Sequence, residues 1–192
     1  MNTSIDKTKT ALVVIDLQKG VIGMPTQPHD SRTVLANAVK LADAFRLNKM
    51  PVFLVRVAMS PDGADRLNPI TASENPWVKR KMPADWSEIV PELGPQEGDF
   101  LITKKQWGAF YDTGLDLQLR RRKIDTIVLC GISTTFGVES TARFAYEYGY
   151  QQIFVEDAMS AQSIAEHTHV IQVVFPRIGR VQTTEAVLAD LG

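Results

Sequence analysis

Cysteine is almost absent from this chain, since Cys130 is the only one among 192 residues. A single cysteine excludes an internal disulfide framework and any zinc site built on closely spaced cysteine pairs. It also fits a reducing compartment. Cys130 lies inside an apolar run, where a free cysteine behaves as a small hydrophobic residue, so we expect it to be buried.

The sequence also lacks an excess of charge of either sign, with 21 Lys and Arg against 22 Asp and Glu. This balance argues against a nucleic-acid or anionic-membrane surface. No apolar run approaches the roughly 20 residues that a membrane span needs, and residues 1–10 do not resemble a signal peptide. We therefore expect a cytoplasmic protein with no nucleic-acid or membrane partner. At roughly 100–200 residues per domain, residues 1–192 should form a single domain.

Short, continuous apolar runs rich in β-branched residues indicate strands that are buried on both faces, as in a parallel sheet. The runs cover residues 11–15, 51–56, 126–130 and 152–155, with a shorter candidate at 99–102. Helical periodicity lies between them. One apolar stripe begins at Val34, with Asp30 or Ser31 as the N-cap. Further helices are predicted at 115–119, at 138–148 before Gly149, and at 185–191. Alternating strands and helices predict an α/β fold with a doubly wound parallel sheet and helices on both faces.

Residues 60–95 break this order, because the stretch is rich in proline and weakly periodic. A stretch of this length is unusual inside a compact domain. Two interpretations stay open. It is either a surface excursion with one short helix near residues 85–90, or a lid or subunit-contact loop whose Trp77 and Trp86 cover a pocket.

Three polar features follow strand ends, where ligands bind in open α/β sheets. Asp16 ends the first run, Lys104 and Lys105 follow the 99–102 run, and the turn 131–137 leads into a helix. A carboxyl group can move protons, an ammonium group can stabilise charge, and helix N-terminal amides can bind an oxyanion. Together they form a candidate catalytic site.

Three segments resemble the motifs of isochorismatase-like hydrolases, in the cysteine hydrolase superfamily, and occur in the family's order. They are ALVVIDLQ at 11–18, KKQWGAFYDT at 104–113 and CGISTTFGVESTAR at 130–143. The resemblance implies a six-stranded parallel sheet and a site formed by Asp16, Lys104 and position 137. The spacing to residues 108–110 selects Lys104 rather than Lys105. We further predict that Gln18, Trp107, Ser133, Thr134 and Phe136 contact the substrate.

This chain departs from most of that family at position 137, where a nucleophilic cysteine is replaced by Gly137. The isochorismatases proper resemble this chain in having glycine there, and they cleave a vinyl ether without a thiol. The resemblance implies that Asp16 protonates the substrate, which requires a pKa raised by burial. It implies that Lys104 orients the substrate, that the Ser133 and Gly137 amides position water, and that the Ile132–Ser133 peptide is cis.

Other candidate sites are weaker. The family's metal-binding members have an Asp-x-His arrangement after the second strand, but residues 56–63 contain no histidine, so no metal or cofactor is expected. Ser133, Asp157 and His167 occur in the order of a hydrolase triad, but the final glycine of the nucleophile elbow is missing. We expect His167 and His169 to be solvated helix residues. The basic run 120–123 either complements a helix dipole or binds an anionic partner. The basic run 79–81 faces either a dicarboxylate substrate or water.

The sequence therefore supports two hypotheses. The first is a metal-independent hydrolase acting on a small, anionic molecule through Asp16 and Lys104, without a cysteine nucleophile. The second is a non-catalytic ligand- or partner-binding protein on a degraded amidase scaffold similar to the nicotinamidases. Under either hypothesis we expect a homo-oligomer, a dimer or higher.

Overall fold

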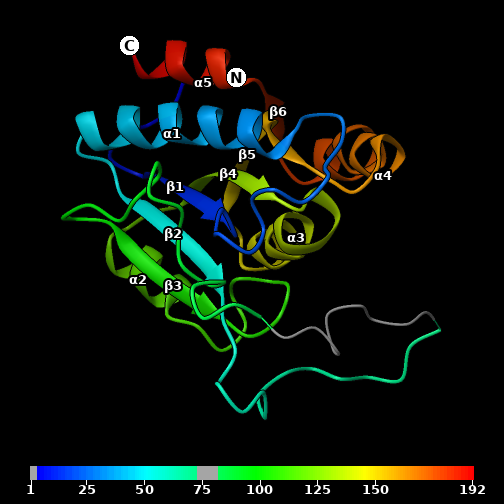
Figure 1. Cartoon of the computed structure of the whole chain (residues 1–192). Coiled ribbons are helices and arrows are strands. Elements are labelled where there is room, and N and C mark those ends of the chain that lie inside the picture. Colours follow the sequence, from blue (N-terminus) through cyan, green and yellow to red (C-terminus); the bar gives the residue numbers. More distant parts are fainter. Residues whose placement is uncertain (1–3, 73–81) are drawn as a thin grey trace.

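The computed structural model describes residues 4–72 and 82–192, and its centre is a six-stranded sheet (Figure 1). The strands are β1 (Thr10–Ile15), β2 (Val52–Val57), β3 (Phe100–Lys104), β4 (Thr126–Ile132), β5 (Gln151–Ser160) and β6 (Arg180–Gln182). They lie in the order β3-β2-β1-β4-β5-β6, and every pair is parallel. The expected doubly wound α/β fold is confirmed.

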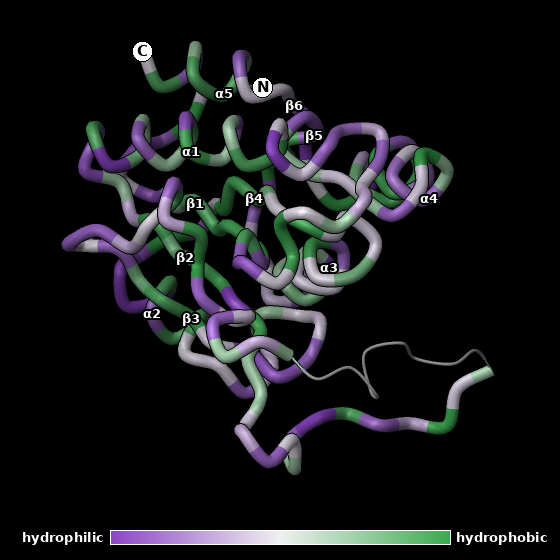
Figure 2. Tube along the Cα trace, in the orientation of Figure 1, coloured by the Kyte–Doolittle hydropathy of each residue, from purple (hydrophilic) through white to green (hydrophobic). Residues whose placement is uncertain are grey.

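Helices cover both faces of this sheet. They are α1 (Ser31–Leu47), α2 (Leu115–Arg121), α3 (Glu139–Glu147), α4 (Ile164–His169) and α5 (Thr184–Leu191). Residues of α1 and α5 join one hydrophobic core, and residues of α2 and α3 join the other. Figure 2 shows the hydrophobic colour along the central strands and the hydrophilic colour on many outer turns. None of the described helices is long and apolar enough to cross a membrane.

The central strands are buried for the reason that the sequence suggests. All six residues of β1 are buried, because β1 lies between β2 and β4 with a helical layer on each side. Cys130, in β4, is fully buried as expected. The predicted start of α1 is also correct, since the Asp30 side chain accepts hydrogen bonds from the amides of Arg32 and Thr33.

Several predicted boundaries were wrong. β3 includes Lys104, so this lysine is the last residue of a strand rather than part of the following loop. β5 continues through Glu156 and Asp157 to Ser160, because a register shift between Leu129 and Gly131 lets β4 and β5 pair again beyond the acids. The predicted end of this strand at residue 155, before the two acids, was therefore too early.

The long stretch 60–95 also differs from its prediction in one part. Residues 85–90 form turns and a single antiparallel bridge between Gln18 and Ile89, rather than a helix. Trp77 and the basic run 79–81 lie outside the described residues. Two further elements, α4 and β6, were not predicted. β6 has three residues, and α4 has six before π and 3₁₀ turns, so neither shows a clear period.

Candidate active site

Asp16 follows the last residue of β1, at the point in the sheet where the strand order reverses. The chain runs outward from β1 through β2 to β3, then returns to β4 on the other side of β1. Ligand sites in open α/β sheets lie at such a point, beyond the carboxyl ends of the strands. Asp16 has a φ of 54°, and its amide donates to the carbonyl of Val55. This backbone turn fixes the carboxylate just beyond the carboxyl end of the central strand β1.

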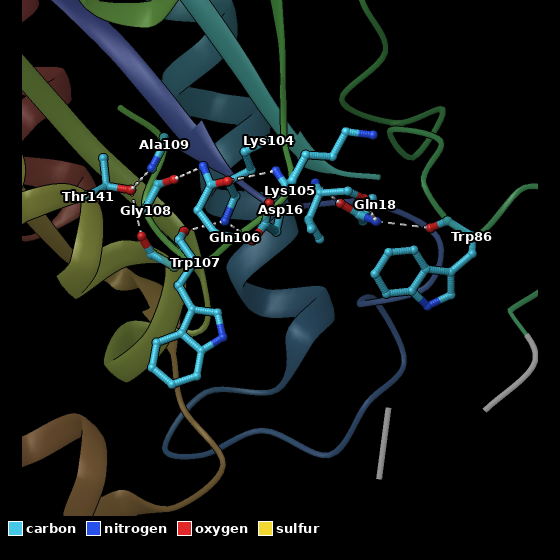
Figure 3. A network of polar contacts seen from close by, with 12 residues as sticks. Asp16, Gln18, Trp86, Lys104, Lys105, Gln106, Trp107, Gly108, Ala109 and Thr141 are labelled. Carbon is cyan, nitrogen blue, oxygen red and sulfur yellow. Dashed lines mark hydrogen bonds and ion pairs between the residues drawn. The ribbon is translucent and has the colours of Figure 1, made fainter. Parts of the chain in front are cut away.

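Asp16 forms a buried ion pair with Lys104, from the end of β3 (Figure 3). Lys104 Nζ lies 2.8 Å from Asp16 Oδ2, and the two side chains are 1% and 10% exposed. The same ammonium group donates to the carbonyl of Trp107. Burial raises the pKa of Asp16 above its usual value, and the positive charge of Lys104 opposes that rise without cancelling it.

The neighbouring lysine has a different environment. Lys105 Nζ lies 2.6 Å from Asp65 Oδ2, and its side chain is 43% exposed. The structure therefore places Lys104, and not Lys105, beside Asp16.

Gly137 lies directly against this ion pair. It belongs to a π-helical turn, Thr134–Val138, that leads from β4 into α3. A Cβ atom at position 137 would lie 3.0 Å from Asp16 Oδ2, 3.2 Å from Lys104 Nζ and 2.8 Å from Ile15 Cγ2. The predicted cis peptide between Ile132 and Ser133 is present. The turn therefore brings its backbone at position 137 next to the ion pair.

The turn is held by Thr141, which the sequence analysis did not select. Its hydroxyl donates to the carbonyl of Gly137 at 2.6 Å and accepts from the amide of Ala109 at 3.1 Å. The signal that could have identified it is its spacing, because a hydroxyl four residues after Gly137 faces the preceding helical turn.

Three buried oxygen atoms around the turn and the ion pair lack a hydrogen-bond partner among the described residues. They are Asp16 Oδ1, Ser133 Oγ and Thr135 Oγ1. Buried polar atoms are normally paired, so these atoms are available to a ligand or to water. Ser133 was predicted as a substrate contact, whereas Thr135 was not.

Two predicted substrate contacts are occupied by other groups. The fully buried Gln18 uses its side-chain amide to bind the backbone of Val57 and the carbonyl of Trp86 (Figure 3). Gln18 therefore attaches the 84–90 segment to the sheet. The fully buried Thr134 has its hydroxyl 3.0 Å from Nδ1 of His167. His167 is only 5% exposed, so the expectation of a solvated histidine was wrong there, while His169 is exposed.

Aromatic rings lie near the ion pair. The Trp107 and Phe136 rings meet edge to face, with centroids 4.9 Å apart, and Trp107 is 62% exposed. Figure 3 shows the Trp107 ring below Asp16 and the Trp86 ring to its right. The exposed Trp107 ring presents a flat apolar surface near the ion pair.

The residues that could supply other chemistry are not gathered at the site. Burial raises the pKa of Cys130 to about 12, so its reactive thiolate form is suppressed. Among residues 4–72 and 82–192, no three His, Cys, Asp or Glu side chains are grouped as metal ligands.

Comparison with known proteins identifies the family. A model described as the isochorismatase domain matches residues 10–186. The uncharacterised isochorismatase family protein YwoC of Bacillus subtilis is 55% identical over 192 residues, covering 100% of this chain and 99% of YwoC. YecD of Escherichia coli O157:H7, also uncharacterised, is 50% identical over 183 residues, covering 95% of this chain and 96% of YecD.

A solved structure agrees with these relatives. An isochorismatase family protein from Burkholderia thailandensis superposes with a TM-score of 0.93 at 43% identity, covering 98% of both chains. Family model, sequence relatives and fold all cover nearly the whole chain, including the segments that carry Asp16, Lys104 and Gly137. The chain therefore belongs to the isochorismatase family of hydrolases.

Proposed function

We propose that this protein hydrolyses a small anionic molecule by acid–base chemistry at Asp16 and Lys104, without a covalent enzyme intermediate. One observation carries the proposal. The buried ion pair lies against position 137, where glycine leaves no side chain that could act as a nucleophile. The raised pKa of Asp16 supports its role as an acid.

The chemistry that suits this arrangement is hydrolysis of a vinyl ether. Asp16 gives its proton to the terminal alkene carbon, while the electron pair of the ether oxygen stabilises the resulting oxocarbenium ion. A water oxygen then bonds to the carbon that carries the ether oxygen, and this water loses a proton to the Asp16 carboxylate. The hemiketal product breaks into an alcohol and a ketone. Lys104 balances the charge of the Asp16 carboxylate and of the anionic substrate, and helix amides position the water.

The direct test of this function is pyruvate release from isochorismate. We expect the protein to release pyruvate, because a general acid with a raised pKa can protonate the alkene carbon of the vinyl ether. The measurement is a coupled assay with lactate dehydrogenase and NADH, with heat-denatured protein as the control. Absence of release would remove isochorismate as the substrate. If a panel of small anionic enol ethers and amides also gave no turnover, the protein would be a binding protein rather than a hydrolase.

Cys130 provides a second test. We expect iodoacetamide to leave turnover unchanged and to add no mass to the folded protein, because the thiol is fully buried and its pKa is raised to about 12. Activity and intact mass are measured on the same sample, and protein labelled in guanidinium chloride serves as the control for reactivity. Loss of activity in proportion to labelling at Cys130 would overturn the thiol-free mechanism.

A further inference from the structure

A buried imidazole lies behind the turn that carries Gly137. His167 is on α4, and its Nδ1 is 3.0 Å from the hydroxyl oxygen of Thr134, the first residue of the π-helical turn. Both side chains are removed from water, with 5% and 0% of each residue exposed. Within the described part of the chain, the structure gives neither atom another hydrogen-bond partner. Each group therefore depends on the other to satisfy a buried polar atom.

The His167 ring in this contact is neutral. Burial, and to a smaller extent His29, lower the pKa of His167 to about 4, so the ring is neutral near pH 7. When the ring proton is on Nε2, Nδ1 accepts a hydrogen bond from the Thr134 hydroxyl. His167 also lines a cavity of about 280 Å³ with His29, Glu156 and Asp157.

This hydrogen bond acts on the same turn as Thr141, but from a different helix. Thr141, on α3, holds the carbonyl of Gly137. His167, on α4, holds the side chain of Thr134, three residues earlier. Position 137 lies close to the ion pair, because a Cβ there would be 3.0 Å from Asp16 Oδ2. A movement of this turn therefore changes the distance between position 137 and Asp16.

We propose that His167 is a positioning residue, which holds the turn 133–137 against Asp16 and Lys104 by binding Thr134 from α4. The effect of His167 on catalysis rests on the proposed function. The effect of His167 on the geometry of the turn can be tested without a substrate, because the surroundings of Asp16 can be measured in the free protein.

The experiment compares variants that remove and restore the hydrogen bond. His167→Leu and Thr134→Val remove it, and the second variant keeps the shape of the side chain. His167→Asn places a polar atom near the position of Nδ1, and Thr134→Ser keeps the hydroxyl. His169→Leu is the matched control, because His169 is on the same helix and is exposed.

Two quantities are measured in each folded variant. The first is the pKa of the Asp16 carboxyl, followed by carbon NMR titration, with its signal assigned by its loss in Asp16→Asn. The second is kcat and KM on a substrate that the wild type hydrolyses. With the hydrogen bond removed, the turn retreats and water reaches Asp16. We expect the Asp16 pKa to fall by about half a unit or more. We also expect kcat to fall by about tenfold, with KM changed by less than about twofold.

The outcomes separate positioning from stability. His167→Asn and Thr134→Ser should restore both quantities to near the wild-type values, and His169→Leu should not change them. The proposal is wrong if His167→Leu and Thr134→Val only lower the melting temperature and leave the Asp16 pKa at its wild-type value. If His167→Leu does not fold, the isosteric Thr134→Val decides. If the wild type hydrolyses nothing, the proposed function fails, and the Asp16 titration alone decides the positioning role.

Discussion

Replacing Asp16 by Asn should lower kcat by about 10²–10⁴-fold, the usual contribution of a positioned general acid. The amide has nearly the same shape as the carboxyl group, so the packing around position 16 changes little, but the amide cannot give a proton to the substrate. The measurement is steady-state kinetics on any substrate that the wild type hydrolyses. Folding of the variant is checked by circular dichroism and thermal unfolding.

The same mechanism predicts the direction of the pH dependence. Asp16 must be protonated to act as an acid, and burial raises its pKa, so kcat should fall as pH rises through that pKa. Asp65→Asn is the matched control, because Asp65 also forms an ion pair with a lysine of the same segment, but in a partly exposed position. Retention of more than about a tenth of wild-type activity by a folded Asp16→Asn variant would exclude Asp16 as the essential acid.

The sequence alone predicts those strands whose pattern of residues follows directly from burial. The runs that became β1, β2 and β4 are continuous because these strands are covered on both faces, and that cause leaves a direct pattern in the sequence. The choice of Lys104 over Lys105 came from motif spacing, and the structure places Lys104 beside Asp16.

The residues that sequence analysis misplaced depend on contacts between distant segments. Gln18 is the last residue of the first motif, 11–18. Its side chain binds the backbone of Val57 and Trp86, which lie 39 and 68 residues away in the sequence. His167 is on a short helix with no clear period, and its burial depends on Thr134, 33 residues earlier. No local sequence pattern identifies these partners. A polar residue is predicted to be exposed unless a buried hydrogen-bond partner for it is already known.

Gly137 illustrates how a small residue can define a site. Its lack of a side chain could be read from the sequence, but not the fact that a Cβ would lie within 3.2 Å of both members of a buried ion pair. Such a close approach means that the turn at position 137 lies directly against Asp16 and Lys104 without placing a side chain between them.

Replacing Lys104 by Met should lower the free energy of unfolding by about 3–5 kcal/mol, the usual cost of removing one partner from a buried ion pair. Methionine keeps the approximate length and volume of the lysine stem, so packing changes little. The loss arises because Asp16 then stays buried without its counter-charge. The measurement is urea unfolding, and Lys105→Met is the matched control, since the Lys105–Asp65 pair is partly exposed to water and pairs in contact with solvent contribute little.

The pH dependence of this loss follows from the protonation of Asp16. Without Lys104, the pKa of Asp16 in the folded state rises further above its unfolded value of about 3.9. Above that unfolded value the folded state binds more protons than the unfolded state, so stability falls as pH rises through the folded-state pKa. The variant should therefore be closer to the wild type at pH 4 than at pH 8. The double variant Asp16→Asn with Lys104→Met should lose less than the two single losses combined, because it leaves no unpaired buried charge. Equal losses at both pH values, or strictly additive losses, would show that the two side chains are not coupled in the folded protein.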